Sequence, residues 1–278
     1  MLRRLRHALF LASMMAAPVW AADCAPVDFL TLPLPQGDDP VVTALRGAYP
    51  GLSVDAAGVR LADGSLIPLG EDPGRPPGAR LAEPSLREQF HDIYPLAFDL
   101  TAREARWHDP GRARVETLFA ALYGNNEQAV RAGLKKVAIS GNAKASFLIS
   151  ERQGAACQMR AALAGVAALS SDWAPAFRNV GGSFNWRKIA GTARMSTHSY
   201  GIAFDLNADL GGYWRWSNRP EGDAGPYDNR IPADVVQVFE RFGFIWGGKW
   251  HHFDGMHFEY RPEIILYARL MGQSAPLR

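Results

Sequence analysis

The amino-acid sequence predicts an α+β fold, from three observations in the second half of the 278-residue chain. Apolar residues recur at helical spacing over 150–170 and 232–242, and short strand-like runs cover 200–206 and 256–260. Long loops separate these elements, and no segment repeats another. Strands that are interrupted by helices and long loops are typical of the α+β class.

The composition excludes several classes of protein. Hydrophobic residues make up 47% and charged residues 21%, which excludes wholesale disorder and a membrane protein with several spans. Residues 1–21 resemble a secretory signal, because Arg3, Arg4 and Arg6 precede a short apolar run. Loss of these three arginines lowers the formal charge from +2 to −1. A near-neutral body gives no reason to expect nucleic-acid binding.

The signal predicts export to the periplasm or cell envelope, with no stable membrane insertion after cleavage. The two cysteines, Cys24 and Cys157, would then lie in an oxidising compartment where a disulfide persists. Pairing and two separate thiols both remain open, because the sequence gives no distance between them. The oligomeric state also remains open.

The first half contains one predicted hairpin and one clear helix. Apolar positions alternate over residues 58–70 on both sides of Asp63-Gly64, which predicts a hairpin with a two-residue turn. Residues 71–80 are rich in Pro and Gly and predict an exposed loop. Apolar spacing over 114–123 predicts a helix that ends at Gly124.

The second half supplies the remaining elements. Pro232 is expected to begin a helix that Gly243 ends. The other predicted elements are a helix over 150–170, strand and loop over 177–186, strands over 200–206 and 256–260, and a closing helix over 262–270.

Two segments of this half contain metal-binding residue types, one from Ser196 to Asp205 and one from Asp254 to Glu259. Zinc in hydrolases commonly takes three nitrogen or oxygen ligands and keeps a fourth position for water. A carboxylate that is not a ligand can accept the proton of that water. The residues suited to these roles are three ligands, His198, Asp205 and His257, and one base, Asp254.

Strand parity supports part of this hypothesis. His257 and Glu259 share one face of their strand, so Glu259 can orient the histidine. Asp254 has the opposite parity and reaches the same ion only if the chain bends near Gly255. By spacing alone, a metal site and ordinary core or loop residues both remain open.

The two segments resemble the M15 family of zinc peptidases, which cleave D-alanyl-D-alanine and related bonds in bacterial peptidoglycan. The family pattern S-x-H-x-x-G-x-A-x-D is matched at every fixed position, by Ser196, His198, Gly201, Ala203 and Asp205. Its second part, a carboxylate three positions before a metal histidine, is matched by Asp254 and His257, which follow Trp246-Gly247-Gly248. Lys249 departs from the acidic residue that often follows the two glycines, which leaves the subfamily open.

The resemblance implies one Zn²⁺ held by His198, Asp205 and His257, with Asp254 as the general base. It implies an M15/hedgehog-like core, with a small mixed or antiparallel sheet flanked by helices. The implied organisation is a signal peptide over 1–21, an N-terminal extension of unknown role over 22–145 and the zinc peptidase domain over 146–278.

Peptidoglycan stem peptides are the implied substrates. D-alanyl-D-alanine carboxypeptidase activity is the first expectation, and L-alanyl-D-glutamate endopeptidase activity is the alternative. A non-catalytic, zinc-stabilised cell-wall binding module is a third interpretation. A purely structural metal site does not need Asp254, and so this residue favours an enzyme.

Neighbouring residues are secondary candidates. Arg187, in preference to Arg194, can bind a substrate carboxylate or polarise the scissile carbonyl. His251 and His252 either act at the oxyanion, hold a second metal or are solvated loop residues. The aromatic residues within 213–227 either line a wall for substrate or pack over the core.

Overall fold

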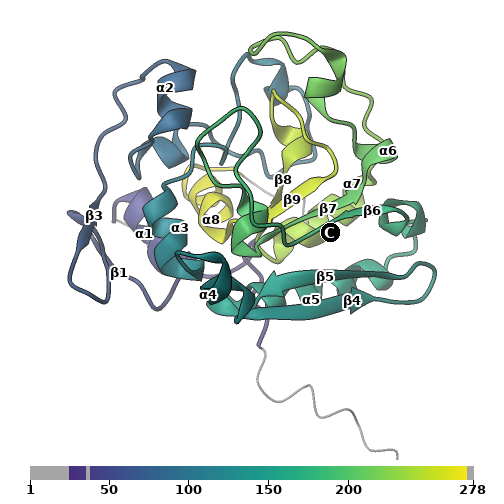
Figure 1. The fold of residues 1–278 in the computed structure, drawn as a ribbon, viewed down its shortest axis with the longest axis horizontal. Helices are drawn as coiled ribbons and strands as arrows, with labels where there is room; N and C mark the ends of the chain where they lie inside the picture. The colour runs from purple at the N-terminus through teal and green to yellow at the C-terminus, as the bar shows by residue number, and fades with distance from the viewer. Residues whose placement is uncertain (1–24, 36–37, 274–278) are drawn as a thin grey trace, which may run out of the picture.

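The computed structural model describes residues 25–35 and 38–273, and it confirms the α+β class (Figure 1). The predicted signal peptide and Cys24 lie outside these residues, and so export and the pairing of Cys24 with Cys157 stay predictions. The described helices are α1 (Pro40–Ala48), α2 (Pro77–Ala82), α3 (Glu116–Tyr123), α4 (Glu127–Arg131), α5 (Ala155–Ala167), α6 (Ala208–Gly211), α7 (Ala233–Arg241) and α8 (Pro262–Leu270). None of the described helices is long and apolar enough to cross a membrane.

The described strands form three antiparallel sheets, with the orders β1-β2-β3, β4-β5 and β6-β7-β9-β8. Their bounds are β1 (Ser53–Asp55), β2 (Gly58–Arg60), β3 (Leu66–Pro68), β4 (Leu134–Ile139), β5 (Ala145–Ser150), β6 (Val180–Gly182), β7 (Ala203–Asn207), β8 (Phe244–Trp246) and β9 (His257–Tyr260). The four-stranded sheet carries both predicted motifs, with β7 and β9 as its inner strands.

The register of β7 and β9 brings the two motifs together. Asp205 on β7 lies directly opposite His257 on β9. Directly opposed residues of an antiparallel pair have Cβ atoms about 4.5–5.5 Å apart. The sheet therefore places two side chains that are 52 positions apart in the sequence within reach of one ion.

An aromatic core fixes these two strands. Phe204 and Phe258 are fully buried, and their rings stack with centroids 5.2 Å apart. The ring of Phe204 also contacts Phe239 of α7, at 4.9 Å, and Phe147 of β5, at 5.0 Å. Because successive strand residues point to opposite faces, the burial of Phe204 directs Asp205 away from this core.

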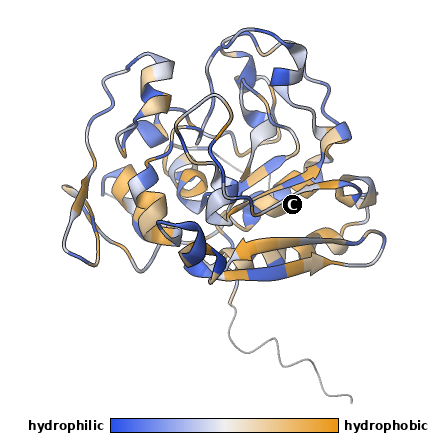
Figure 2. Cartoon of the chain, viewed as in Figure 1, coloured by the Kyte–Doolittle hydropathy of each residue, from blue (hydrophilic) through white to orange (hydrophobic). Residues whose placement is uncertain are grey.

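The β4–β5 hairpin lies beside the sheet and packs on α5 (Figure 1). In Figure 2 the hairpin is mostly hydrophobic, whereas the neighbouring α4 is hydrophilic. Ile139 pairs with Ala145 at the turn end of the hairpin, and so the expected boundary between residues 145 and 146 falls inside a paired unit. Buried apolar residues from both sides of this position form one continuous cluster.

The first and last described helices also pack together. α1 lies against α8, and the hydroxyl of Tyr49 donates a hydrogen bond to Glu263 at 2.6 Å. Glu263 is fully buried and also accepts from Arg261, at 2.5 Å. The segment before the motifs is therefore part of the same packed body as the segment that contains them.

Local predictions were confirmed at several helix ends and were wrong in two places. Gly124 and Gly243 end α3 and α7 with positive φ, as expected. The hairpin loop has three residues, 62–64, because Leu61 pairs with Ser65 and Gly64 takes a φ of 84°; hairpins use this loop length when glycine takes the left-handed position. The predicted loop 71–80 already includes the start of α2, where Pro77 favours the first helical turn.

Candidate metal centre

A tight turn positions His198 in front of β7. Ser196 caps the 3₁₀ helix η6 (Thr197–Tyr200), because its hydroxyl accepts a hydrogen bond from the main-chain N–H of His198 at 3.4 Å. Gly201 ends the turn with a φ of 65°, and a Cβ on it would lie only 2.4 Å from Leu134. Ser196 therefore shapes the loop, and the turn requires glycine at its end.

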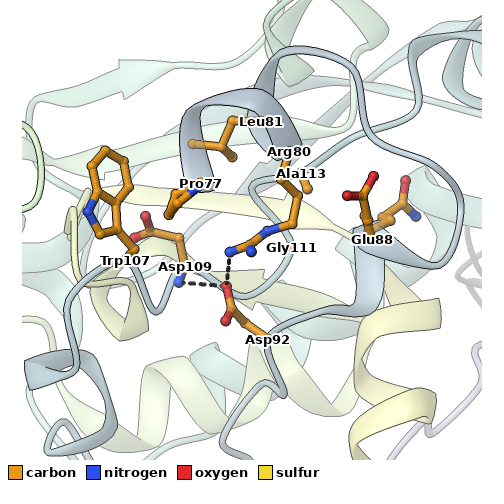
Figure 3. A pocket seen from close by; sticks show the side chains of 10 residues that line it. Pro77, Arg80, Leu81, Glu88, Asp92, Trp107, Asp109, Gly111 and Ala113 are labelled. Atoms are coloured by element: carbon orange, nitrogen blue, oxygen red, sulfur yellow. Dashed lines mark hydrogen bonds and ion pairs between the residues drawn. The ribbon is translucent and has the colours of Figure 1, made fainter. Parts of the chain in front are cut away.

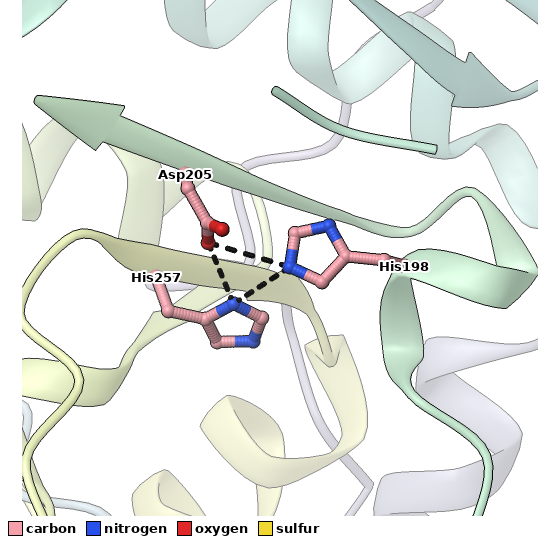
Figure 4. A group of neighbouring side chains, drawn as sticks. All are labelled: His198, Asp205 and His257. Atoms are coloured by element: carbon pink, nitrogen blue, oxygen red, sulfur yellow. Dashed lines mark hydrogen bonds and ion pairs between the residues drawn. The ribbon is translucent and has the colours of Figure 1, made fainter. Parts of the chain in front are cut away.

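The three predicted ligands meet at one point (Figure 4). Nε2 of His198 lies 3.2 Å from Nδ1 of His257 and 3.3 Å from Oδ1 of Asp205. Nδ1 of His257 lies 3.0 Å from the same carboxylate oxygen. Both imidazoles are buried, and the side chain of Asp205 is one-fifth exposed.

This triangle has the dimensions of a tetrahedral metal site. Bonds of about 2.0–2.1 Å to a tetrahedral zinc ion separate its ligand atoms by about 3.3 Å. The three measured separations, 3.0, 3.2 and 3.3 Å, are close to that value. Two nitrogens and one oxygen leave one of four tetrahedral positions for water or substrate. The donor set therefore fits the ion that the sequence predicts.

The second nitrogen of each imidazole has an acceptor that fixes the required tautomer. Nδ1 of His198 faces the main-chain oxygen of Ser183. Nε2 of His257 lies 3.3 Å from Oε2 of Glu259, the residue expected to orient this histidine. Glu259 is itself fully buried and paired with Arg114, at 2.6 Å. Each histidine can thus donate from its outer nitrogen while its inner nitrogen faces the centre.

The charges of the centre are strongly coupled. Burial lowers the pKa of His257, but hydrogen bonds to Asp205 and Glu259 outweigh burial and raise this pKa to about 10. Burial raises the pKa of Asp205, but the bonds and charges of His198 and His257 hold it well below its usual range. The metal-free centre therefore holds a carboxylate beside an imidazolium.

Asp254 reaches this region through the expected bend. Its main-chain oxygen accepts from the N–H of His257 at 3.0 Å, which closes a turn over Gly255 and Met256. Gly255 does not take positive φ, and close packing is what requires it: a Cβ there would lie 2.0 Å from the main-chain oxygen of Gly211. The bend was predicted correctly, and its physical reason is steric.

The carboxyl group of Asp254 has an oxygen without a partner. Oδ1 is buried and accepts no hydrogen bond from the described residues. Burial, the largest effect, raises the pKa of Asp254 to about 6, against the opposing charge of His257. The negative charge of Asp205 also raises it, so the two carboxylates interact electrostatically. A buried carboxylate of this kind is suited to take up a proton near neutral pH.

The other predicted candidates have different surroundings. The side chain of Arg187 is exposed, and its hydrogen bond to the main-chain oxygen of Lys188 is long, at 3.5 Å. Nδ1 of His252 lies 2.6 Å from Asp109, and its Nε2 accepts from the N–H of Gly222 at 2.8 Å. Both histidines of the pair 251–252 are buried, and so the interpretation as solvated loop residues was wrong. The three ligands are brought together, and Arg187 makes no described contact with them.

The aromatic residues between the motifs divide into two groups. Trp214 is buried, with its ring 4.7 Å from that of His252, which agrees with packing over the core. Trp216 is 60% exposed and lies edge-on to Tyr213, whose main chain pairs with Asp254. Of these three residues, only Trp216 is exposed.

Lys249, which departs from the family pattern, is part of a buried ion pair in the core. Its ammonium is fully buried, 2.5 Å from Glu240 and 2.7 Å from the main-chain oxygen of Pro95. Tyr94 also donates to Glu240, at 2.6 Å. This lysine therefore joins the N-terminal segment to α7 and leaves the metal centre unchanged.

Sequence reasoning did not find the contribution of residues 103–114. Arg114 holds Glu259, and Asp109 holds His252. The guanidinium of Arg112 lies 5.8 Å from the ring of Trp250, which lies 5.7 Å from the ring of His257. The only signal in the sequence is a high density of arginine in this segment, and no motif connects it with the later residues.

A small pocket in the N-terminal part is separate from this centre (Figure 3). Arg80 faces Asp92 at 3.7 Å, and Asp92 also accepts from the main-chain N–H of Asp109 at 3.1 Å. None of the three ligands lines the pocket, and neither does Asp254. Its charged groups already have partners, and so the pocket is not favoured as a substrate site.

Comparison with known proteins agrees with the motifs. Residues 190–260 match the family model of M15 peptidases described as D-alanyl-D-alanine carboxypeptidase. No curated protein and no solved structure matches the chain. The matched residues include all three metal-ligand candidates and Asp254. Residues 190–260 are therefore similar to M15 family peptidases in sequence, and the structure brings together the metal-ligand candidates within them.

Proposed function

We propose that the protein is an exported, zinc-dependent peptidase that hydrolyses the D-alanyl-D-alanine bond of peptidoglycan stem peptides. Two observations together carry this proposal: three donors with the spacing of a tetrahedral site, and a buried carboxylate oxygen of Asp254 that has no partner among the described residues. A site that only stabilised the fold would need the donors and would have no use for that oxygen.

Zinc is the ion that the donors favour. Two imidazole nitrogens and one carboxylate oxygen in a tetrahedral arrangement are typical of catalytic zinc. When bound, the ion supplies Lewis acidity, which lowers the pKa of a water molecule to about 7 and polarises the scissile carbonyl. His198 and His257 hold their inner nitrogens ready for it, because Ser183 and Glu259 engage the outer ones.

Asp254 supplies the proton transfer in this proposal. Its unpartnered Oδ1 accepts a proton from the attacking water and passes it to the nitrogen of the departing amino acid. The raised pKa of about 6 keeps the carboxyl ionised at neutral pH and still able to hold a proton. The turn over Gly255 fixes the main chain of Asp254 relative to that of His257.

Arg187 is the proposed group for the developing oxyanion. Its main-chain N–H is held by the hydroxyl of Ser199, next to His198, at 2.9 Å. Its exposed side chain would give up only a long hydrogen bond to Lys188 in order to reach a bound substrate. A guanidinium stabilises the negative oxygen of a tetrahedral intermediate by charge and by paired hydrogen bonds.

Incubation of the zinc-loaded protein with purified muropeptides tests the function. Mass spectrometry should show loss of one alanine, whereas cleavage between L-Ala and D-Glu would separate the whole stem. Asp254→Asn should reduce turnover about 10²–10⁴-fold, the usual contribution of a general base, with zinc content near one per chain. Asp209→Asn, which changes an exposed carboxylate close to β7, is the matched control. Unchanged turnover in Asp254→Asn would show that the assigned base is wrong.

A further inference from the structure

The guanidinium groups of Arg112, Arg114 and Arg194 lie near one another, and only the first two form ion pairs with described carboxylates. Arg114 is paired with Glu259, and Arg112 is paired with Asp109 at 3.0 Å. Arg194 forms no ion pair with a described carboxylate, and its Nη1 lies 3.5 Å from the main-chain oxygen of Arg112. Arg194 therefore has no direct ion-pair partner among the described residues, and the carboxylates of Glu116 and Glu221 act on it only from a greater distance.

The environment of Arg194 is costly for a cation. Burial, the largest effect, and the charges of Arg114 and Arg112 together lower its pKa to about 10, although the charges of Glu116 and Glu221 oppose them. A half-buried guanidinium that is repelled by two others gains most from an added anion. This property distinguishes Arg194 from a solvated surface arginine, whose charge is already stabilised by water.

Arg112 connects this group to the reacting end of the site. Its guanidinium lies over the ring of Trp250, which contacts the ring of His257. Its charge acts on the pKa of Asp254 and on that of Tyr213, whose main chain pairs with Asp254. An anion held between Arg112 and Arg194 would therefore lie close to the proposed base.

The chemistry of the stem peptide supplies such an anion on the residue after the scissile bond. In a stem that ends in D-Ala-D-Ala, the departing D-Ala carries a free α-carboxylate. In the bond between L-Ala and D-Glu, the glutamate is linked onward through its side chain, and so its α-carboxylate is also free. Both bonds therefore place a carboxylate of a D-residue at the same position relative to the attacked carbonyl.

We propose that Arg112 and Arg194 bind the α-carboxylate of the D-amino acid that supplies the leaving amine, an inference that rests on the proposed function. Arg112 comes from the N-terminal segment, so the segment before residue 146 completes the substrate site. These two residues are specificity determinants: they hold the substrate, and the proton transfer belongs to Asp254. Charge-assisted, paired hydrogen bonds to a carboxylate are the strongest contacts that this surface offers.

Binding of matched peptides to the zinc-loaded, full-length Asp254→Asn protein tests the inference by calorimetry. The probe is L-Ala-γ-D-Glu-L-Lys-D-Ala-D-Ala, compared with one form amidated at the C-terminus and one amidated at the D-Glu α-carboxylate. We expect one amidation to weaken binding about 10- to 100-fold, as loss of charge-assisted hydrogen bonds does. The sensitive carboxylate identifies the source, terminal D-Ala or D-Glu.

Variants test whether the two arginines cause the difference in affinity between the free-acid and amidated peptides. Arg194→Gln should remove the discrimination between acid and amide, and Arg194→Lys should restore part of it. Arg112→Gln should act in the same direction. Because this change leaves buried Asp109 without its arginine partner, thermal unfolding should be measured to check that the variant is folded. Lys188→Gln, which removes an exposed cation from the same hairpin as Arg194, should leave discrimination unchanged.

The outcomes separate this inference from the proposed function. The inference is refuted if Arg194→Gln and folded Arg112→Gln still bind the free-acid peptide more tightly than the amidated one. It is also refuted if the protein binds all three peptides equally well. If the unmodified enzyme hydrolyses the free-acid peptide and its amidated forms equally well, the peptidase proposal is supported and the carboxylate site is refuted. If the unmodified enzyme binds the free-acid peptide more tightly than an amidated form but hydrolyses none of the peptides, the carboxylate site is supported and the peptidase proposal is refuted.

Discussion

Metal binding at the centre should release a proton, because His257 is protonated in the metal-free protein. The pKa of this histidine is raised to about 10. Its Nδ1 lies 3.0 Å from Asp205 and its Nε2 lies 3.3 Å from Glu259, so both N–H groups of an imidazolium have a carboxylate acceptor. A ligand nitrogen must be deprotonated, and so a metal ion has to displace the proton on Nδ1.

The size of this effect follows from the pKa. At pH 7, three units below a pKa of about 10, removal of the proton costs about 4 kcal/mol at about 1.36 kcal/mol per unit. A raised pKa keeps the proton bound at neutral pH, and so the proton competes with the metal there. Apparent zinc affinity should therefore rise about tenfold per pH unit and level off as pH approaches 10.

Calorimetry of zinc binding to chelator-stripped protein measures the proton directly, when it is repeated in buffers of different ionisation enthalpy. We expect release of at least one proton per zinc near pH 7–8, because a zinc-bound water would add to the proton lost from His257. His91→Gln, which changes a histidine paired with Asp72 at 2.6 Å outside the centre, should leave this number unchanged. His257→Gln should abolish tight binding. Tight binding without proton release in the unmodified protein would refute the reasoning.

The proposed base and the buried core give independent tests. Hydrolysis of stem peptides should fall as pH drops below about 6, because the raised pKa of Asp254 leaves its carboxyl protonated there; a flat kcat/KM profile across this value would contradict the assignment. Lys249→Met should lower the free energy of unfolding by about 3–5 kcal/mol in urea, since it leaves buried Glu240 without its charge partner. Adding Glu240→Leu should recover most of that loss, and failure to recover would argue against a buried ion pair. Phe204→Ala should cost about 3–5 kcal/mol in thermal denaturation, and a loss below about 1 kcal/mol would show that its ring is not central to the core.

The structure brings His198, Asp205 and His257 together, and two of the three lie on strands, where the sequence pattern is most informative. Period-two alternation in a strand fixes which face Asp205 occupies once Phe204 is assigned to the core. The turn that presents His198 was not predicted: the expected strand began at residue 200, whereas Gly201 ends the turn and β7 begins at Ala203. The pairing of β7 with β9 had to be assumed, and the resemblance to M15 peptidases supplied that assumption.

The remainder of the site could not be predicted because it depends on contacts between distant segments. Arg112 and Arg114 carry no local pattern that identifies their partners, and their roles follow from the packing of the N-terminal segment against Trp250 and Glu259. The same is true of Lys249, whose buried partner lies on α7. Side-chain parity gives the face of an element and says nothing about which remote element covers it.

The contact between α1 and α8 has a consequence for biosynthesis. Tyr49 is made early, and its partner Glu263 belongs to the last helix. A chain that grows from its N-terminus cannot satisfy these groups until translation is nearly finished, and so its final collapse is delayed until the ribosome releases it. Nascent chains stalled before residue 262 should therefore be digested readily by added protease, whereas released full-length chains should resist.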